Sequence, residues 1–237
     1  MLKLARRIAA ALAAAIFILM ALQFTLPQAL ERRVERELAR TFEGSRMVRV
    51  GIEAFPAVAL LWGRVDRIHL DLRRVPLGDL VVDAVLVDGK DLVVDVPKLL
   101  WGNGVEIQGA RELRATFVIA EEDLNQYFWS QIHDARFFKV SLTRGQAVLE
   151  GGLTLFGREI DVRVSGVFRV AGPASIAFIP QQVTVDNAAV PQLLVDWVTS
   201  EWQIVLELGE APFAIAIEEL WVEEGELLIY GARPASG

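Results

Sequence analysis

Polar and apolar residues alternate most clearly over residues 140–170. In the last part of this segment one face of the chain would carry Ile160, Val162, Val164 and Phe168, and charged residues and serine fill the other face. A two-residue repeat with one apolar face is typical of an antiparallel strand that buries one side. Two residue pairs in this segment, Arg144-Gly145 and Phe156-Gly157, end in glycine. We expect a turn at each pair, and therefore three strands joined by two turns.

The same two-residue repeat extends over most of the chain. A run at residues 77–96 contains Asp88-Gly89, a pair typical of hairpin turns, so we expect a break there. Pro180 has no amide hydrogen and predicts an edge or a break in its strand. A final hairpin is expected to turn at Glu224-Gly225. The other expected strands are residues 47–55, 64–75, 105–120 and 175–186.

Helical spacing of apolar residues predicts helices between these strands. Residues 121–132 begin with three carboxylates, which favour the positive end of a helix dipole. Residues 191–206 have a similar apolar stripe, and residues 56–63 and 97–102 each form a short turn that starts with proline and ends with glycine. No low-complexity linker divides residues 45–231. We therefore predict an α+β fold in which residues 27–237 form a single domain.

The first 26 residues have a different character. Lys3, Arg6 and Arg7 precede an apolar run at residues 8–26, which is close to the length needed to cross a membrane. We expect a transmembrane anchor in the cytoplasmic membrane, and a cleaved signal peptide is the alternative. In both cases the basic residues stay on the cytoplasmic side and the body is extracytoplasmic.

A second, amphipathic helix is expected at residues 27–43. Pro27 would occupy the first helical position, where proline is tolerated. One apolar residue recurs at every fourth position and charges fill the other faces, so a narrow flank is expected to pack on the body. The stripe consists of Leu30, Val34, Leu38 and Phe42.

Charge and cysteine content exclude several classes of function. The formal net charge is −7; three basic residues are the only charges before Gln28, so the remainder carries 21 basic against 31 acidic residues, or −10. Such an acidic body lacks the basic surface that nucleic-acid binding requires. The negative charge also argues against binding to anionic membranes by electrostatic attraction alone. The chain has no cysteine, which excludes disulfides and thiolate metal sites.

Residues typical of catalytic sites are scarce. His69 and His133 are the only histidines, and neither adjoins a nucleophile motif. Without cysteines, two histidines provide too few ligands for a zinc site. The carboxylates at residues 121–123 are explained by the start of a helix, and no phosphate loop or dinucleotide fingerprint is present. We therefore expect no enzyme activity, no metal and no cofactor.

Apolar side chains are in excess. Hydrophobic residues make up 53% of the chain, and 18 glycines add to them, whereas the two together usually make up about 45–50%. Residues 80–87 and 148–156 carry apolar side chains on both faces of a strand. One face must therefore meet something other than water. A core covered by a helix and an apolar cavity for a ligand both satisfy this requirement.

A series of short motifs runs along most of residues 51–231. They are Phe55-Pro56 with Leu60-Leu61-x-Gly63, Val65-x-x-Ile68, Ala120-Glu-Glu-Asp-Leu-Asn-Gln-Tyr127, Leu149-Glu-Gly-Gly, Phe156-Gly157-Arg158, Trp202-x-Ile-x-Leu-x-Leu208, Pro212-Phe213 and Glu224-Gly-x-Leu-x-Ile-x-Gly231. In kind and order these motifs resemble those of the LmeA-type bacterial envelope phospholipid-binding proteins, and none of them carries a catalytic residue.

The resemblance implies an extracytoplasmic protein with a strongly curved antiparallel sheet wrapped around a helix, as in the tubular lipid-binding superfamily. It also implies that a phospholipid or other acyl lipid is held in an apolar groove, for envelope lipid maintenance or transfer. Burial contributes about 0.8 kcal/mol per CH₂ group removed from water, before the costs of binding. The rival interpretation is an envelope scaffold whose core is filled by its own side chains.

The residues expected to line such a groove follow from one-face parity on the strands and on the helix at residues 121–132. They are Phe117, Ile119, Leu124, Phe128, Val162, Val164 and Phe168.

Overall fold

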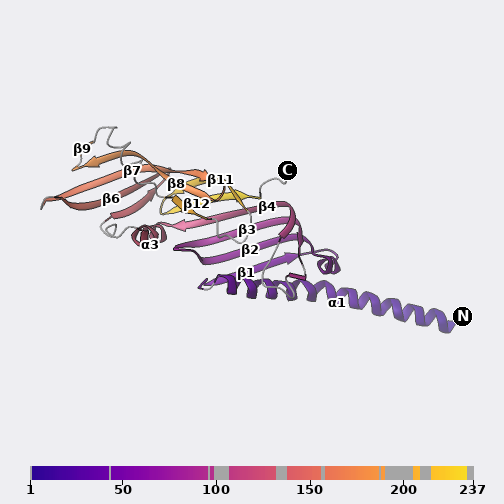
Figure 1. The fold of residues 1–237 in the computed structure, drawn as a ribbon. Coiled ribbons are helices and arrows are strands. Elements are labelled where there is room, and N and C mark those ends of the chain that lie inside the picture. The colour runs from indigo at the N-terminus through magenta and orange to yellow at the C-terminus, as the bar shows by residue number, and fades with distance from the viewer. Residues whose placement is uncertain are drawn as a thin grey trace. The chain divides into compact units, whose positions relative to one another are not determined.

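The computed structural model describes residues 2–42, 44–95, 97–98, 107–131, 138–155, 158–186, 188–189, 205–208 and 215–233 (Figure 1). In these residues a long helix, α1, a shorter helix, α3, and a 3₁₀ helix, η1, accompany the strands. The helices are α1 (Leu2–Thr41), η1 (Ala57–Trp62) and α3 (Glu121–Gln131). The strands are β1 (Met47–Glu53), β2 (Arg64–Leu77), β3 (Leu80–Val94), β4 (Ile107–Ala120), β5 (Phe138–Thr143), β6 (Gln146–Leu155), β7 (Arg158–Gly172), β8 (Ser175–Val185), β9 (Ala188–Ala189), β10 (Val205–Glu207), β11 (Ala216–Glu223) and β12 (Glu226–Ala232).

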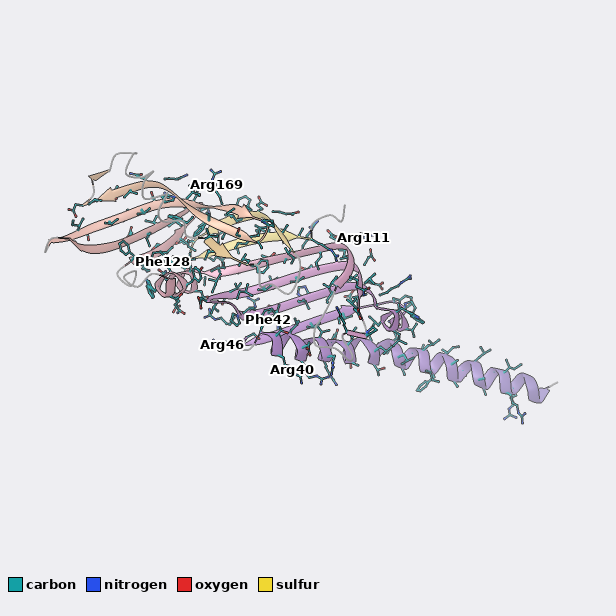
Figure 2. All side chains as sticks on the ribbon, viewed as in Figure 1. Arg40, Phe42, Arg46, Arg111, Phe128 and Arg169 are labelled. Atoms are coloured by element: carbon teal, nitrogen blue, oxygen red, sulfur yellow. The ribbon has the colours of Figure 1, made fainter. Side chains whose placement is uncertain are left out.

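Helix α1 is one continuous helix with Pro27 inside it, so the prediction of a second helix starting at Pro27 is wrong. A proline in a helix interior removes one hydrogen bond and costs about 3 kcal/mol, but contacts on both sides of Pro27 hold this helix on the body. Before it, the Gln23 amide donates to the carbonyl oxygen of Ala54. After it, the predicted stripe is buried through Val34, Leu38 and Phe42, and Figure 2 shows Phe42 where α1 ends beside β1.

The first half of α1 is exposed wherever its side chains are described, from Arg6 to Met20. Its apolar side chains are exposed from Ile8 to Met20. This segment is long and apolar enough to cross a membrane.

The first sheet has the strand order β1-β2-β3-β4-β12-β11. Strand β3 runs unbroken through Asp88-Gly89, so the predicted hairpin there is wrong; the turn lies earlier, at Gly78, where φ is 59°. Gly89 serves packing instead of turning. A Cβ atom at Gly89 would lie 2.9 Å from the Ile68 Cγ2 atom and 3.1 Å from the Leu113 Cδ1 atom, so a larger residue does not fit without movement.

The second sheet has the order β10-β8-β7-β6-β5 and contains the predicted three-strand meander. Its first turn is at Gly145, where φ is 76°, and the second expected turn, at residues 156–157, lies outside the described residues. At Pro180 the pairing of β8 with β7 shifts register, since Gly166 pairs with Pro180 but Ser165 pairs with Gln182. Strand β8 itself is continuous from Ser175 to Val185, so Pro180 marks an irregularity in the pairing and not the predicted break in the strand.

The helix predicted at residues 191–206 lies mostly outside the described residues. Its last two positions are wrong, because Val205 and Leu206 belong to strand β10 and pair with Ala177 and Ile176 of β8. Backbone pairing with an open strand edge outweighs the helical spacing of side chains here. The short turn expected at 56–63 is confirmed as η1, with Gly63 as its left-handed cap.

The α+β prediction is confirmed: a long apolar helix precedes two antiparallel sheets, and the second sheet curls beside α3 (Figure 1). The chain divides into two compact units, residues 1–43, 48–71 and 87–113 in one, and residues 44–47, 72–86 and 114–237 in the other. Strands β2, β3 and β4 each supply residues to both units. That residues 27–237 form a single domain stays a prediction.

Candidate functional site

A small apolar pocket lies between helix α3 and one face of the second sheet. Its cavity is about 20 Å³, roughly the space of one water molecule. The lining is formed almost wholly by carbon atoms of aliphatic and aromatic side chains. The lining residues are Leu124, Tyr127 and Phe128 from α3, Val140 from β5, Ala147 and Leu149 from β6, Phe168 from β7 and Phe178 from β8.

Strand register and helical spacing bring these residues together. Val140 is the partner of Leu149, and Phe168 is the partner of Phe178, so each pair projects from the same face of the sheet. Leu124 and Phe128 are four residues apart and therefore share one face of α3. Figure 2 shows Phe128 on this helix.

Two phenylalanine rings form one wall of the pocket. The centroids of Phe168 and Phe178 are 5.5 Å apart, with their planes at 59°, a tilted geometry that aromatic pairs favour. Gly166 leaves room for the second ring, because a Cβ atom there would lie 2.7 Å from the Phe178 Cζ atom. The glycine in the apolar face of β7 thus sets the position of the wall.

On the side of α3 next to strand β5, three side chains join the helix to the edge of that strand. We call these residues the α3 clasp: Glu121, Asn125 and Trp129. The Asn125 amide accepts from the Val140 N–H (2.7 Å) and donates to the Val140 carbonyl oxygen (2.8 Å). Glu121 accepts from the Leu142 N–H (2.8 Å), and the Trp129 indole N–H donates to the Phe138 carbonyl oxygen (2.6 Å).

The clasp fits because two spacings nearly match. Its residues are four apart on a helix, about 6 Å, and they meet every second residue of β5, about 6.8 Å. Within the second sheet β5 is the last strand, so its outward backbone groups would otherwise be open to another strand. The clasp satisfies four of them, the Leu142 carbonyl oxygen accepts from the Gly225 N–H, and α3 is thereby fixed over the pocket.

The start of α3 is fixed by an ion pair. Asp123 is 2% exposed, and its carboxylate accepts from the Arg74 guanidinium at 2.5 Å. The hydrogen bond with Asp123 raises the pKa of Arg74 above its ordinary value; burial opposes this, and the negative charges of Asp123, Asp83 and Glu122 add to it. The guanidinium is therefore charged at neutral pH.

Three of the seven predicted lining residues line the pocket: Leu124, Phe128 and Phe168. Phe117 and Ile119 are buried in strand β4, where they pair with Ile229 and Leu227 of β12. Val164 is buried and Val162 is half-buried on β7, but neither is part of the pocket lining. That all seven hold a lipid stays a prediction.

Sequence reasoning missed five lining residues. For the four residues on strands the missing information is the register between strands, which pairs Val140 with Leu149, Ala147 with Gly166, and Phe168 with Phe178. Parity within a single strand cannot supply this information, and Tyr127 lies on α3. The missed residues are Tyr127, Val140, Ala147, Leu149 and Phe178.

A second hollow, on the other face of the same strands, has a different chemistry. It is wider, about 290 Å³, but open to solvent and largely polar, with Arg163 held by an ion pair to Glu150. His69 lies elsewhere, exposed and within 2.8 Å of the Asp88 carboxylate, and His133 is outside the described residues. Among the residues that the structure describes, no cluster of His, Cys, Asp or Glu could hold a metal ion.

Comparison with known proteins gives one result. The model of the LmeA-like phospholipid-binding family matches residues 21–232. Neither the curated proteins nor the solved structures contain a match. The family match extends from the second half of α1 through β12 and includes both sheets and the pocket. The chain therefore belongs to the LmeA-like phospholipid-binding family.

Proposed function

We propose that this protein is a membrane-anchored, extracytoplasmic phospholipid-binding protein. It holds an acyl chain in the apolar pocket between α3 and strands β5–β8 and catalyses no reaction on it. The observation that carries the proposal is an apolar pocket in a chain of a phospholipid-binding family. Maintenance or transfer of envelope lipids is the role that such binding would serve.

The chemistry of the pocket suits an acyl chain. Each methylene group transferred from water to the pocket contributes about 0.8 kcal/mol, so ten groups would contribute about 8 kcal/mol before the costs of ordering the chain. No charged side chain is among the lining residues, so a charged headgroup would remain outside.

The pocket must widen to admit a chain, because its cavity is about 20 Å³. Helix α3 is held along β5 by the clasp, whereas on its other flank the Tyr127 hydroxyl donates to the Val205 carbonyl oxygen over 3.5 Å, a weak contact. Opening on the Tyr127 side, with the clasp as the hinge, would separate the aromatic residues of α3 from the sheet.

The first half of α1 supports anchoring and sidedness. Its exposed apolar residues satisfy the length and composition of a membrane span, and basic residues before Ile8 favour a cytoplasmic position for that end. An anchor retained on the mature protein would keep the body beside the bilayer. The intact mass of the purified chain tests this, because removal of a signal peptide would shorten the chain by about 20 residues.

Native mass spectrometry of the full-length chain, released from lipid nanodiscs, tests lipid binding. A matched pair of variants, Ala147→Leu and Ala115→Leu, assigns the site. Both alanines are buried, 1% and 2% exposed, but only Ala147 lines the pocket. Each substitution overpacks a core by a similar amount, about 1–3 kcal/mol. We expect phospholipid on the natural chain and on Ala115→Leu, and much less on Ala147→Leu.

The second candidate function is a scaffold whose core is filled by its own side chains. The small size of the cavity favours it. A natural chain that carries no phospholipid and takes none up from added vesicles would support the scaffold and contradict the proposal. Equal lipid on the two variants would place the lipid outside the pocket.

A further inference from the structure

Three large apolar side chains are exposed on the loop between β1 and β2. Phe55 is 81% exposed, Trp62 is 72% exposed and Leu61 is 56% exposed. Clustered exposed apolar side chains of this size commonly mark an interaction surface. We call residues 54–63, which contain all three, the docking loop.

The docking loop is tied to helix α1 at one residue, Gln23. The Gln23 amide donates to the Ala54 carbonyl oxygen (3.0 Å) and accepts from the Ala57 N–H (2.8 Å), so it grips the backbone on both sides of Phe55-Pro56. Next to it on the helix, Phe24 is also exposed. The loop and Phe24 therefore lie at the point where α1 leaves the body.

The length of the apolar run determines how deep Gln23 and the docking loop would lie in a bilayer. Residues 8–22 would rise about 22 Å as a helix, which falls short of a hydrocarbon layer of about 30 Å. Residues 8–26 would rise about 28 Å and nearly fill it. A span of this length brings Gln23 and the loop fastened to it to the boundary between acyl chains and headgroups.

The backbone of the docking loop is adapted to such a place. Within η1 the Ala59 and Gly63 N–H groups bind the Pro56 and Leu60 carbonyl oxygens, and the Phe55 N–H donates to the Asp66 carboxylate at 2.6 Å. Polar groups near the membrane interior must be satisfied within the protein. Trp and Phe are favoured at this boundary, where an apolar ring lies beside polar headgroups.

We propose that the docking loop inserts into the leaflet on the side of the body, in the same bilayer that α1 spans. Phe55, Leu61 and Trp62 lie among the acyl chains near the headgroups and fix the rotation of the first unit about α1. This inference rests on the proposed anchoring by α1, and the experiment must therefore report on the two separately.

Single cysteines test the insertion, because the chain has none of its own. Variants Trp62→Cys and Leu61→Cys are made in the full-length chain, labelled with a polarity-sensitive fluorophore and reconstituted into phosphatidylcholine vesicles that contain nitroxide-labelled lipids. Ile16→Cys, within the apolar run, reports the hydrocarbon interior. Arg36→Cys is exposed on α1, about 20 Å beyond Gln23 along the helix, and reports water.

We expect the labels at 61 and 62 to lose most of their fluorescence to nitroxides near the headgroups, and the label at 16 to nitroxides deep in the bilayer. The label at 36 should be unquenched. Labels at 61 and 62 that behave like the one at 36, with normal quenching at 16, would overturn the docking and leave the anchor intact. Absence of quenching at 16 would overturn the anchoring itself.

Discussion

At the scale of single residues, Arg74 has a left-handed backbone conformation and a side chain that pairs with Asp123. Its φ is 56°, a region that costs a residue other than glycine about 1–3 kcal/mol. Its side chain is 35% exposed, and its guanidinium meets the carboxylate of Asp123, whose side chain is 2% exposed. Without Arg74, Asp123 at the start of α3 would be a buried charge without its cation.

Replacing Arg74 tests the value of this pair. We expect Arg74→Met to lower the free energy of unfolding by about 3 kcal/mol, at the low end for a buried pair because Arg74 is partly solvated. Arg67→Met is the control, since Arg67 pairs with Glu53 at an exposed site and should cost at most about 1 kcal/mol. Urea unfolding followed by circular dichroism measures both; equal losses would contradict the prediction.

The Arg74–Asp123 pair should contribute the same amount to the free energy of unfolding across the neutral pH range. A group whose pKa is raised on folding stabilises the protein fully below its unfolded-state pKa, and this contribution is lost as the pH rises through the folded-state value. For Arg74 both values are strongly alkaline. The difference between the natural chain and Arg74→Met should therefore show no dependence on pH between about 6 and 9, where Arg is fully charged.

Gly89 shows where sequence reasoning fails at this scale. An Asp-Gly pair fits a turn and fits equally a strand position where packing leaves no room for a side chain; the neighbours that decide, Ile68 and Leu113, are distant in sequence. We expect Gly89→Ala to destabilise by about 1–3 kcal/mol. Gly51→Ala, whose Cβ would meet its nearest atom at 3.9 Å, should be neutral or stabilising in the same unfolding assay.

At the scale of elements, the sequence predicts strands and α3 well because period-two and helical patterns are local. The positions of β1, β2, the meander, the last hairpin and α3 follow from such patterns. The pocket does not, because it depends on the register between β6, β7 and β8 and on the clasp. Asn125 is part of the recognised acidic Leu-Asn motif, yet its role is visible only once Val140 of the edge strand lies opposite.

Loss of a clasp residue should leave part of the edge of β5 unpaired. We expect Asn125→Ala to leave the Val140 N–H and carbonyl oxygen without partners and to lower the free energy of unfolding by about 1–3 kcal/mol. An open edge also favours pairing between copies of the chain, so light scattering should show more self-association. Gln126→Ala, exposed on the same helix, is the control and should change the free energy by less than about 0.5 kcal/mol.

At the scale of the whole molecule, the two compact units share three strands. Since β2, β3 and β4 each pass from one unit into the other, loss of one unit would unpair strands of the other. We expect a single cooperative transition. Fluorophores on Arg49→Cys in the first unit and on Glu219→Cys in the second should report the same urea midpoint; separate midpoints would divide the body into independent domains.

The negative charge of the body should affect the rate at which the anchored protein takes up lipid from a second membrane. Beyond residue 27 the net charge is −10, so an anionic surface repels the body at low ionic strength, and salt screens this repulsion within about 10 Å at 0.1 M. With the chain in phosphatidylcholine proteoliposomes, uptake of a fluorescent phospholipid from added vesicles should slow as their anionic lipid fraction rises, and recover with sodium chloride. Faster uptake from anionic vesicles, weakened by salt, would instead indicate a basic docking surface that the sequence does not predict.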